Sequence, residues 1–154
     1  MSANRRKLLA YIIFPLAVGG ISGFLTRNSM NMYTSLNRPP LSPPGWVFPL
    51  VWTILYLLMG ISSYLIASSS SPKKREALLL YAVQLLLNFI WSPIFFGLRN
   101  YLLAFLVLLL LWYAIYKMIR SFFPINSTAA LLQIPYLLWV TFAGYLNLAI
   151  VFLN

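Results

Sequence analysis

The chain alternates between five long hydrophobic stretches and short polar connections. A helix that crosses the hydrocarbon core of a bilayer, about 30 Å thick, needs about 20 mostly apolar residues. Each stretch has about this length, so we expect membrane-spanning helices at about 8–25, 46–67, 77–97, 101–119 and 129–153. Helix ends predicted in this way carry an error of about two to four residues. The pattern predicts an all-α integral membrane protein, a five-transmembrane-helix bundle that forms one domain, residues 1–154.

The longest connection, residues 26–45, carries two proline pairs, Pro39-Pro40 and Pro43-Pro44. Proline fixes φ and lacks an amide donor, and the residue before a proline is pushed toward an extended conformation. We therefore expect a stiff, extended segment, which loses little conformational entropy when it covers a cavity. Because Tyr33 and Trp46 lie in and beside it, we interpret residues 26–45 as a lid with aromatic contacts, and name it the lid segment. A rigid surface connection is the alternative.

Lys and Arg are unevenly divided between the two sides of the predicted bundle. Cytoplasmic loops of membrane proteins carry an excess of these residues. The side of the N-terminus carries eight of them, Arg5, Arg6, Lys7, Lys73, Lys74, Arg75, Lys117 and Arg120. The opposite side carries three, Arg27, Arg38 and Arg99. We therefore expect a cytoplasmic N-terminus, with the lid segment and the C-terminus on the outer face.

The net charge of +10 fits this topology signal, together with attraction to anionic head groups of membrane lipid. Nucleic-acid binding would need a basic face on a water-exposed module, which the hydrophobic pattern does not provide, so we expect no nucleic-acid partner. A signal peptide is an alternative for residues 8–25. It is disfavoured because no A-x-A-like cleavage site follows and four further hydrophobic stretches do. We expect a multi-pass protein of a bacterial cell membrane.

The amino-acid composition excludes most classes of enzyme. Of the 154 residues, 62% are hydrophobic and 8% charged, against roughly 45–50% and about 25% in soluble domains. The chain has no Cys, no His and a single acid, Glu76. Thiol nucleophiles, His-containing triads and carboxylate pairs are therefore absent, and we expect no metal site and no required cofactor. The remaining chemistry belongs to aromatic rings, amides, hydroxyls and the backbone.

Aromatic and amide side chains recur at helical spacing in three of the predicted spans. These residues are Trp52, Tyr56 and Met59; then Gln84, Asn88, Trp91, Ser92 and Phe95; then Gln133, Tyr136, Trp139, Ala143, Leu146 and Asn147. Aromatic residues at this spacing are also typical of simple packing. An amide in lipid, however, is costly unless it is paired, so we expect the four amides to face the bundle interior and to bond to one another or to a ligand. An apolar cavity with a few polar groups is typical of small-molecule sites, and Trp and Tyr faces favour a flat ligand.

Small and ring-constrained residues also mark the spans. Pro15, Pro93 and Pro135 predict kinks, which either open a cavity or pack inertly. Gly19, Gly20 and Gly23 permit close helix contact. We expect that contact within the bundle, with a homodimer face as the alternative.

Three sequence blocks in order resemble the tryptophan-rich sensory protein family, also called the TspO/MBR family, translocator proteins or peripheral-type benzodiazepine receptors. The blocks are MYTSLNRPPLSPPGWVFPLVWTILYLLMG at 32–60, QLLLNFIWSPIFFG at 84–97 and IPYLLWVTFAGYLN at 134–147. The resemblance implies a five-helix membrane bundle, frequently dimeric, whose first loop covers a pocket. It implies porphyrin or haem-type tetrapyrrole ligands, drug-like isoquinoline carboxamides and benzodiazepines and, in animals, cholesterol.

Matched residue by residue, the resemblance and the helical faces together predict a ligand-binding set. The set is Tyr33, Pro43, Trp52, Tyr56, Asn88, Trp91, Ser92, Trp139, Ala143 and Leu146. Two family tryptophans linked to light-dependent porphyrin breakdown fall on Trp52 and Trp139, which are the candidate redox-active residues.

The chain also departs from the family pattern. Met32 and Leu41 stand where relatives usually carry Trp in the lid, which puts photochemical turnover in doubt. Ala149 and Phe152 stand where the animal cholesterol motif needs Tyr and a basic residue, so that site is not expected.

Three functions compete. The favoured one is a membrane-embedded tetrapyrrole-binding protein that acts as a sensor or regulator. The first alternative is a light-dependent porphyrin-degrading enzyme, since indoles can donate electrons without an acid or a His. The second is a transporter of small amphipathic molecules, which the missing buried charges disfavour.

Overall fold

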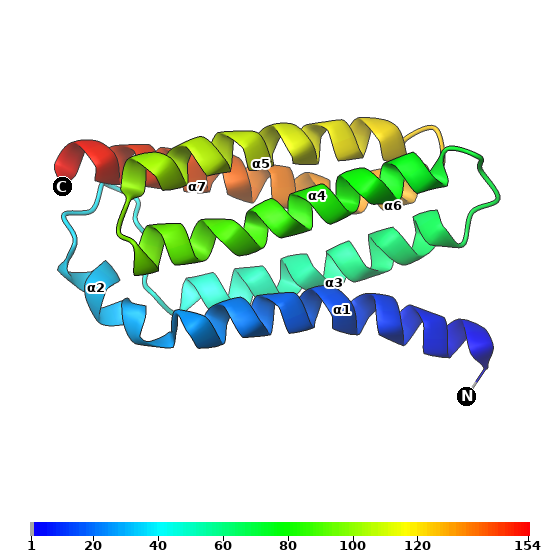
Figure 1. Cartoon of the computed structure of the whole chain (residues 1–154), viewed down its shortest axis with the longest axis horizontal. Helices are drawn as coiled ribbons and strands as arrows, with labels where there is room; N and C mark the ends of the chain where they lie inside the picture. Colours follow the sequence, from blue (N-terminus) through cyan, green and yellow to red (C-terminus); the bar gives the residue numbers. More distant parts are fainter. Residues whose placement is uncertain (1) are drawn as a thin grey trace.

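The structure is a computed structural model that describes residues 2–154, with the side chain of Met30 left out. Within this range the chain is helical and has no strand. Among the described residues, five helical segments are long and apolar enough to cross a membrane. They are α1 (Ala3–Leu25), α3 (Val47–Ala67), α4 (Lys74–Ser92) with the turn that follows it, α5 (Tyr101–Phe122), and α7 (Ile134–Leu153) with the short helix before it. They run side by side in alternating directions, and because their number is odd, the two ends of the chain lie at opposite ends of the bundle (Figure 1). The predicted all-α, five-helix fold is confirmed.

Two helix ends have clear local causes. Helix α1 begins at Ala3, earlier than expected, because the Ser2 side chain accepts a hydrogen bond from the backbone N–H of Arg5 at 3.4 Å and caps the helix. Helix α5 begins at Tyr101 because the Asn100 side chain accepts from the N–H of Leu103 at 3.0 Å. The three-residue turn before α5 places Arg99 at a φ of 52°.

Half of the lid segment is helical, which corrects the expectation of an extended chain throughout. A 3-10 turn, η1 (Arg27–Ser29), leads into the short helix α2 (Met30–Ser35). The proline rule acts only on the residue before each proline, and no proline precedes residue 39 in this segment. Extended backbone starts at Leu36, where ψ is 148°.

The prolines at residues 93 and 135 lie at helix irregularities. Pro93 opens a π-helical turn, η2 (Pro93–Gly97), that continues from α4. Pro135 lies in the first turn of α7, directly after Gln133 separates that helix from α6 (Ser127–Leu132). At Pro135 the missing amide N–H falls in the first turn of a helix, where the helical ladder does not need it. At Pro93 it interrupts the ladder of α4, and the backbone passes into the wider π-helical turn. Pro15, by contrast, lies inside a continuous α1.

Glycines set the spacing between α1 and α3. A Cβ on Gly60 of α3 would lie 2.5 Å from the Cα of Ile12, so the two backbones touch there. A Cβ on Gly19 would overlap the ring of Tyr56. Gly20 and Gly23 meet no atom within 4 Å. Only one of the three α1 glycines is therefore used for the close contact expected within the bundle.

Candidate functional site

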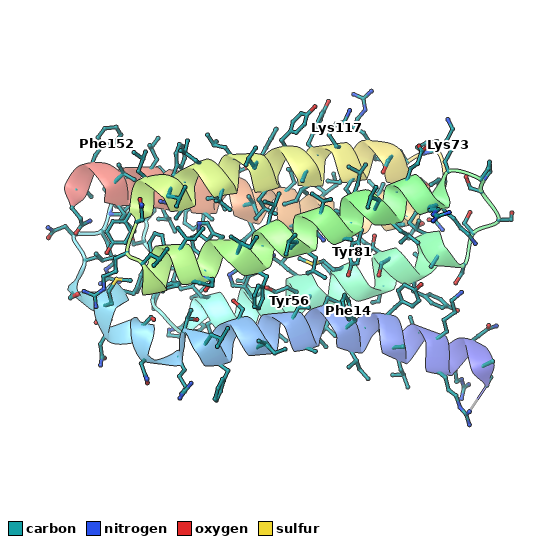
Figure 2. All side chains as sticks on the ribbon, in the orientation of Figure 1. Phe14, Tyr56, Lys73, Tyr81, Lys117 and Phe152 are labelled. Carbon is teal, nitrogen blue, oxygen red and sulfur yellow. The ribbon has the colours of Figure 1, made fainter. Side chains whose placement is uncertain are left out.

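A cavity of about 490 Å³ lies among α1, η1, α2, α3, α4, η2, α5 and α7. Its volume falls within the range of about 300–1,000 Å³ that is usual for small-molecule sites. The cavity lies at the end of the bundle that carries α2, away from Lys73 and Lys117 (Figures 1 and 2). Most of its wall is aromatic or aliphatic, with a few amide and hydroxyl groups.

Helix α2 brings Tyr33 to the cavity. The Tyr33 side chain is buried, and its hydroxyl donates a hydrogen bond to the carbonyl oxygen of Pro43 at 3.0 Å. The guanidinium of Arg38 lies 4.9 Å from the centre of the Tyr33 ring, a cation–π contact. The helical half of the lid segment is thus tied to the proline-rich half.

The proline-rich half is in turn tied to α7. The Tyr145 hydroxyl donates to the carbonyl oxygen of Pro40 at 2.9 Å. The backbone N–H of Asn37 donates to the Asn154 side chain at 3.1 Å, and that side chain donates back to the Asn37 carbonyl at 3.0 Å. These contacts hold the lid segment over the end of the bundle.

Aromatic rings form a connected wall. Trp52 stacks on Tyr56, with ring centres 5.7 Å apart, because the two lie one turn apart on α3. Phe48 lies one turn earlier and meets Tyr33 at 5.2 Å and Trp139 at 5.9 Å, both edge to face. Such pairs hold their rings in a fixed orientation. The wall therefore offers preset ring faces and edges to a flat ligand.

A chain of buried hydrogen bonds forms the polar floor of the cavity. The Tyr56 hydroxyl donates to Asn88 Oδ1 at 2.9 Å, and Asn88 Nδ2 donates to the Tyr136 hydroxyl at 2.8 Å. The Tyr136 hydroxyl donates to Gln84 Oε1 at 2.7 Å. Tyr56 and Asn88 line the cavity, whereas Tyr136 and Gln84 lie behind it. The expectation that the amides face the interior is met, since all four are buried: Gln84, Asn88, Gln133 and Asn147.

Two tryptophans differ in how their indole N–H is used. Trp91 Nε1 donates to Asn147 Oδ1 at 3.0 Å, and Asn147 Nδ2 donates to the carbonyl of Tyr101 at 2.9 Å, which fixes the Trp91 ring. Trp139 Nε1 is buried and has no partner among residues 2–154. The Trp139 ring therefore lines the cavity, whereas its N–H is enclosed by protein and does not face the open space.

The cavity carries one charged side chain among the described residues that line it, Arg27. Its Nη1 donates to the carbonyl of Phe24 at 2.8 Å, and its guanidinium lies 4.0 Å from the centre of the Phe24 ring. The single acid of the chain, Glu76, lies in the first turn of α4, at the other end of the bundle. This electrostatic setting favours neutral or anionic ligands over cationic ones.

The structure brings together nine of the ten predicted ligand-binding residues at the cavity wall. These are Tyr33, Trp52, Tyr56, Asn88, Trp91, Ser92, Trp139, Ala143 and Leu146. Pro43 does not line the cavity, and contributes its carbonyl to Tyr33 instead. Trp46, expected to contact the cavity beside the lid, is 67% exposed and lies outside it.

The two departures from the family pattern also lie off the wall. Met32 packs with Phe95, Ala104 and Ile150 in a separate buried cluster. Leu41 is 81% exposed at a φ of 70°. Neither Met32 nor Leu41 lines the cavity, but Phe95 and Ile150, which pack with Met32, do.

Two kinds of wall residue are absent from the predicted set. Phe48 precedes Trp52 by four positions, so helical spacing places it on the same face and was sufficient to find it. The α1 wall, which includes Leu16, Gly19 and Ser22, has no aromatic or amide side chain and gave no comparable signal.

Comparison with known proteins agrees with this architecture. The sequence model of the TspO/MBR family matches residues 11–153. The tryptophan-rich protein TspO of Chlorobaculum tepidum is 41% identical over 142 residues, which cover 90% of each chain. The tryptophan-rich sensory protein of Cereibacter sphaeroides is 38% identical over 79% of this chain and 76% of its own. The translocator protein of Bos taurus is 36% identical over 90% of this chain and 85% of its own.

Proposed function

Because the chain belongs to the TspO/MBR family of integral membrane proteins, we propose that it binds porphyrins and similar flat, largely apolar ligands within the membrane, and acts as a sensor or regulator of tetrapyrrole levels. The observation that carries the proposal is the aromatic cavity beneath the lid segment, with Trp52 and Trp139 in one wall. A flat ring system gains most from such rigid aromatic surfaces.

The polar groups of the cavity suit the edges of such a ligand. The amide of Asn88 and the hydroxyl of Tyr56 can bond to polar atoms at its buried end. Arg27 supplies positive charge for the carboxylates that porphyrins carry at their periphery. The proposed pose therefore directs the carboxylates toward Arg27 and the apolar ring into the cavity.

The test is a titration of the full chain in lipid nanodiscs with protoporphyrin, followed by the shift of the porphyrin absorption band. Empty nanodiscs of the same lipid serve as the control, because porphyrins partition into lipid. We expect a saturable shift with one site per chain. A shift that grows linearly and matches that of empty nanodiscs rejects the proposal.

A second function, light-dependent porphyrin degradation, is supported by one observation. Trp52 and Trp139 line the same cavity, so either indole can donate an electron to a photo-excited porphyrin, which passes it to dioxygen as superoxide. The indole radical cation regains an electron from the porphyrin, and the oxidised macrocycle combines with the superoxide, so that dioxygen is the net oxidant. Illumination of the complex in air tests it. Bleaching of the porphyrin band faster than with the heat-denatured protein supports the reaction, and equal bleaching rejects it.

We also propose that the N-terminus faces the cytoplasm. The eight basic residues counted on that side lie near the chain start, around the first residue of α4, and toward the end of α5. A cysteine introduced at Asn154 and labelled from outside intact cells tests this orientation, and labelling only after lysis reverses it.

A further inference from the structure

The outer side of the lid segment carries large apolar side chains that the protein does not cover. Leu41 is 81% exposed, and Trp46, the residue before α3, is 67% exposed. Pro40 and Pro44, which lie beside and between them in the chain, are exposed as well. We call these four residues the lid tip. The proposed function uses the inner side of the lid segment and leaves this apolar surface unexplained.

Leu41 stands where a tight turn favours a different residue. The N–H of Ser42 donates to the carbonyl of Pro39 at 3.4 Å, which closes a β-turn. The central residues of this turn are Pro40 and Leu41, and the φ of Leu41 is 70°. Proline followed by a positive φ is typical of a type II turn, whose second central position favours glycine or asparagine. The turn therefore holds a bulky apolar side chain outside the protein at a conformational cost.

The backbone of this turn region presents few polar groups that need water. Residues 39, 40, 43 and 44 are prolines, which have no N–H. Each of their four carbonyls accepts a hydrogen bond from the protein, and the donors in chain order are Ser42, Tyr145, Tyr33 and Val47. Backbone that touches lipid needs such bonds, because hydrocarbon offers no partner to a polar group. A loop surrounded by water has no such requirement.

The bond from Tyr145 indicates where the lid tip lies along the bundle. After α2 the chain reaches the C-terminal end of α7 and then returns to the start of α3 (Figure 1). Tyr145 lies eight residues before Leu153, the last residue of α7, which corresponds to about 12 Å of helix. Because Cα–Cβ bonds lean toward the N-terminus of a helix, Pro40 meets α7 beside its membrane-spanning part and not beyond its end.

We propose that the lid tip inserts into the interfacial layer of the bilayer, where head groups meet acyl chains. Tryptophan is enriched at this level because its ring is apolar and its N–H needs a polar partner. The N–H of Leu41, which has no partner within residues 2–154, suits this layer because water still reaches it. The lid segment thus contacts lipid on its outer side, while Tyr33 on its inner side lines the cavity.

Quenching of Trp46 emission measures the depth of the lid tip. The full chain without porphyrin is reconstituted in bilayers whose acyl chains carry bromine either close to the head group or near the middle of the bilayer. The contribution of Trp46 is the emission that Trp46→Phe loses. We expect the shallow bromines to quench this contribution at least twofold more strongly than the deep ones, and iodide in the water to quench it poorly.

Trp112 is the matched control because it lies halfway along α5 and is 37% exposed, so its ring faces lipid. Its contribution, taken from Trp112→Phe, should be quenched more strongly by the deep bromines. Quenching of Trp46 by iodide and not by bromine would place the lid tip in water. Protection of Trp46 from both would place it against protein, such as a second copy of the chain. Either result overturns the proposal.

A second variant tests the turn itself. Leu41→Trp adds an indole at a position that is exposed, so the substitution is compatible with the fold. We expect the added emission to behave as that of Trp46 does, with stronger quenching by the shallow bromines. Ser70→Trp, in the polar connection after α3, is the control in water and should be quenched by iodide. The same quenching by iodide at residues 41 and 70 overturns the proposal. Porphyrin is not used, so the outcome is independent of the proposed function.

Discussion

The two ends of the helical bundle differ in what fills the space between the helices. At the end that carries Lys73, aliphatic and aromatic side chains such as Ile66, Met118 and Phe122 are fully buried against one another. At the α2 end, the helices enclose the cavity, and the wall aromatics Phe48, Trp52 and Trp139 are only partly buried. Close packing of side chains stabilises a helix bundle, so the Lys73 end contributes most to the stability of the fold. The α2 end has fewer packing contacts because it encloses the cavity.

The contrast predicts its largest effect on stability at the packed end. Phe122→Ala removes a fully buried ring, and we expect a loss of about 3–5 kcal/mol in the free energy of unfolding. Phe48→Ala, at the cavity, should lose less than half as much because that ring already borders open space. Thermal unfolding in detergent compares the two, with lipid-facing Leu79→Ala as a control. Equal losses of stability for Phe122→Ala and Phe48→Ala would contradict the distinction between a packed end and a cavity end.

The glycines of the α1–α3 contact test the same division on a smaller scale. Gly60→Ala forces a methyl group against the backbone of Ile12, and we expect a loss of about 1–3 kcal/mol. Gly20→Ala places its methyl group in open space beside the cavity and should leave the melting temperature nearly unchanged. A variant pair with the reverse order of melting temperatures would show that the helices are spaced differently.

At the cavity the expected effects are on ligand affinity. Asn88→Leu removes the amide that lines the floor and leaves the hydroxyls of Tyr56 and Tyr136 without their partner. We expect protoporphyrin to bind about tenfold more weakly, the equivalent of one lost hydrogen bond of about 1.4 kcal/mol. The titration in nanodiscs measures it. An unchanged dissociation constant in a folded variant would remove Asn88 from the site.

Arg27 should give the smallest effect, because it is exposed and its charge is screened by solvent. Arg27→Gln is expected to weaken binding of a carboxylate-bearing porphyrin by about threefold at low salt, and less at high salt. Arg99→Gln, outside the cavity wall, is the control and should change nothing. Equal effects of the two substitutions would show that only the overall surface charge matters.

Local patterns account for the helices and for one face of the site. The spans could be predicted because each is a long apolar stretch, and Trp52 and Tyr56 could be placed together because one helical turn separates them. Helix α2 was not predicted because the prolines that follow it were expected to hold the whole segment extended, whereas they act only on the residue before them. Trp46 was misplaced because it stands at the start of α3, where a shift of one residue turns a side chain outward.

Tertiary placement decided the rest. The contribution of α1 to the wall depends on the contact of Gly60 with Ile12, which brings α1 beside α3. The α1 residues of the wall, such as Leu16, Gly19 and Ser22, are small or aliphatic, so no periodicity within α1 indicates that they line a cavity. The carbonyl of Pro43 accepts a hydrogen bond from Tyr33 and does not line the cavity, because the lid segment folds back on itself.

The proposed function places porphyrin in the cavity that Trp52 and Trp139 line. Titration of Trp52→Phe/Trp139→Phe tests it most directly, read from the porphyrin band because the fluorophores themselves are removed. Trp112→Phe is the matched control, since Trp112 lies on α5 outside the cavity and donates to Thr141 at 2.8 Å. We expect the double variant to bind porphyrin at least tenfold more weakly and the control to bind it as the wild-type chain does. Equal affinity of all three proteins would contradict it.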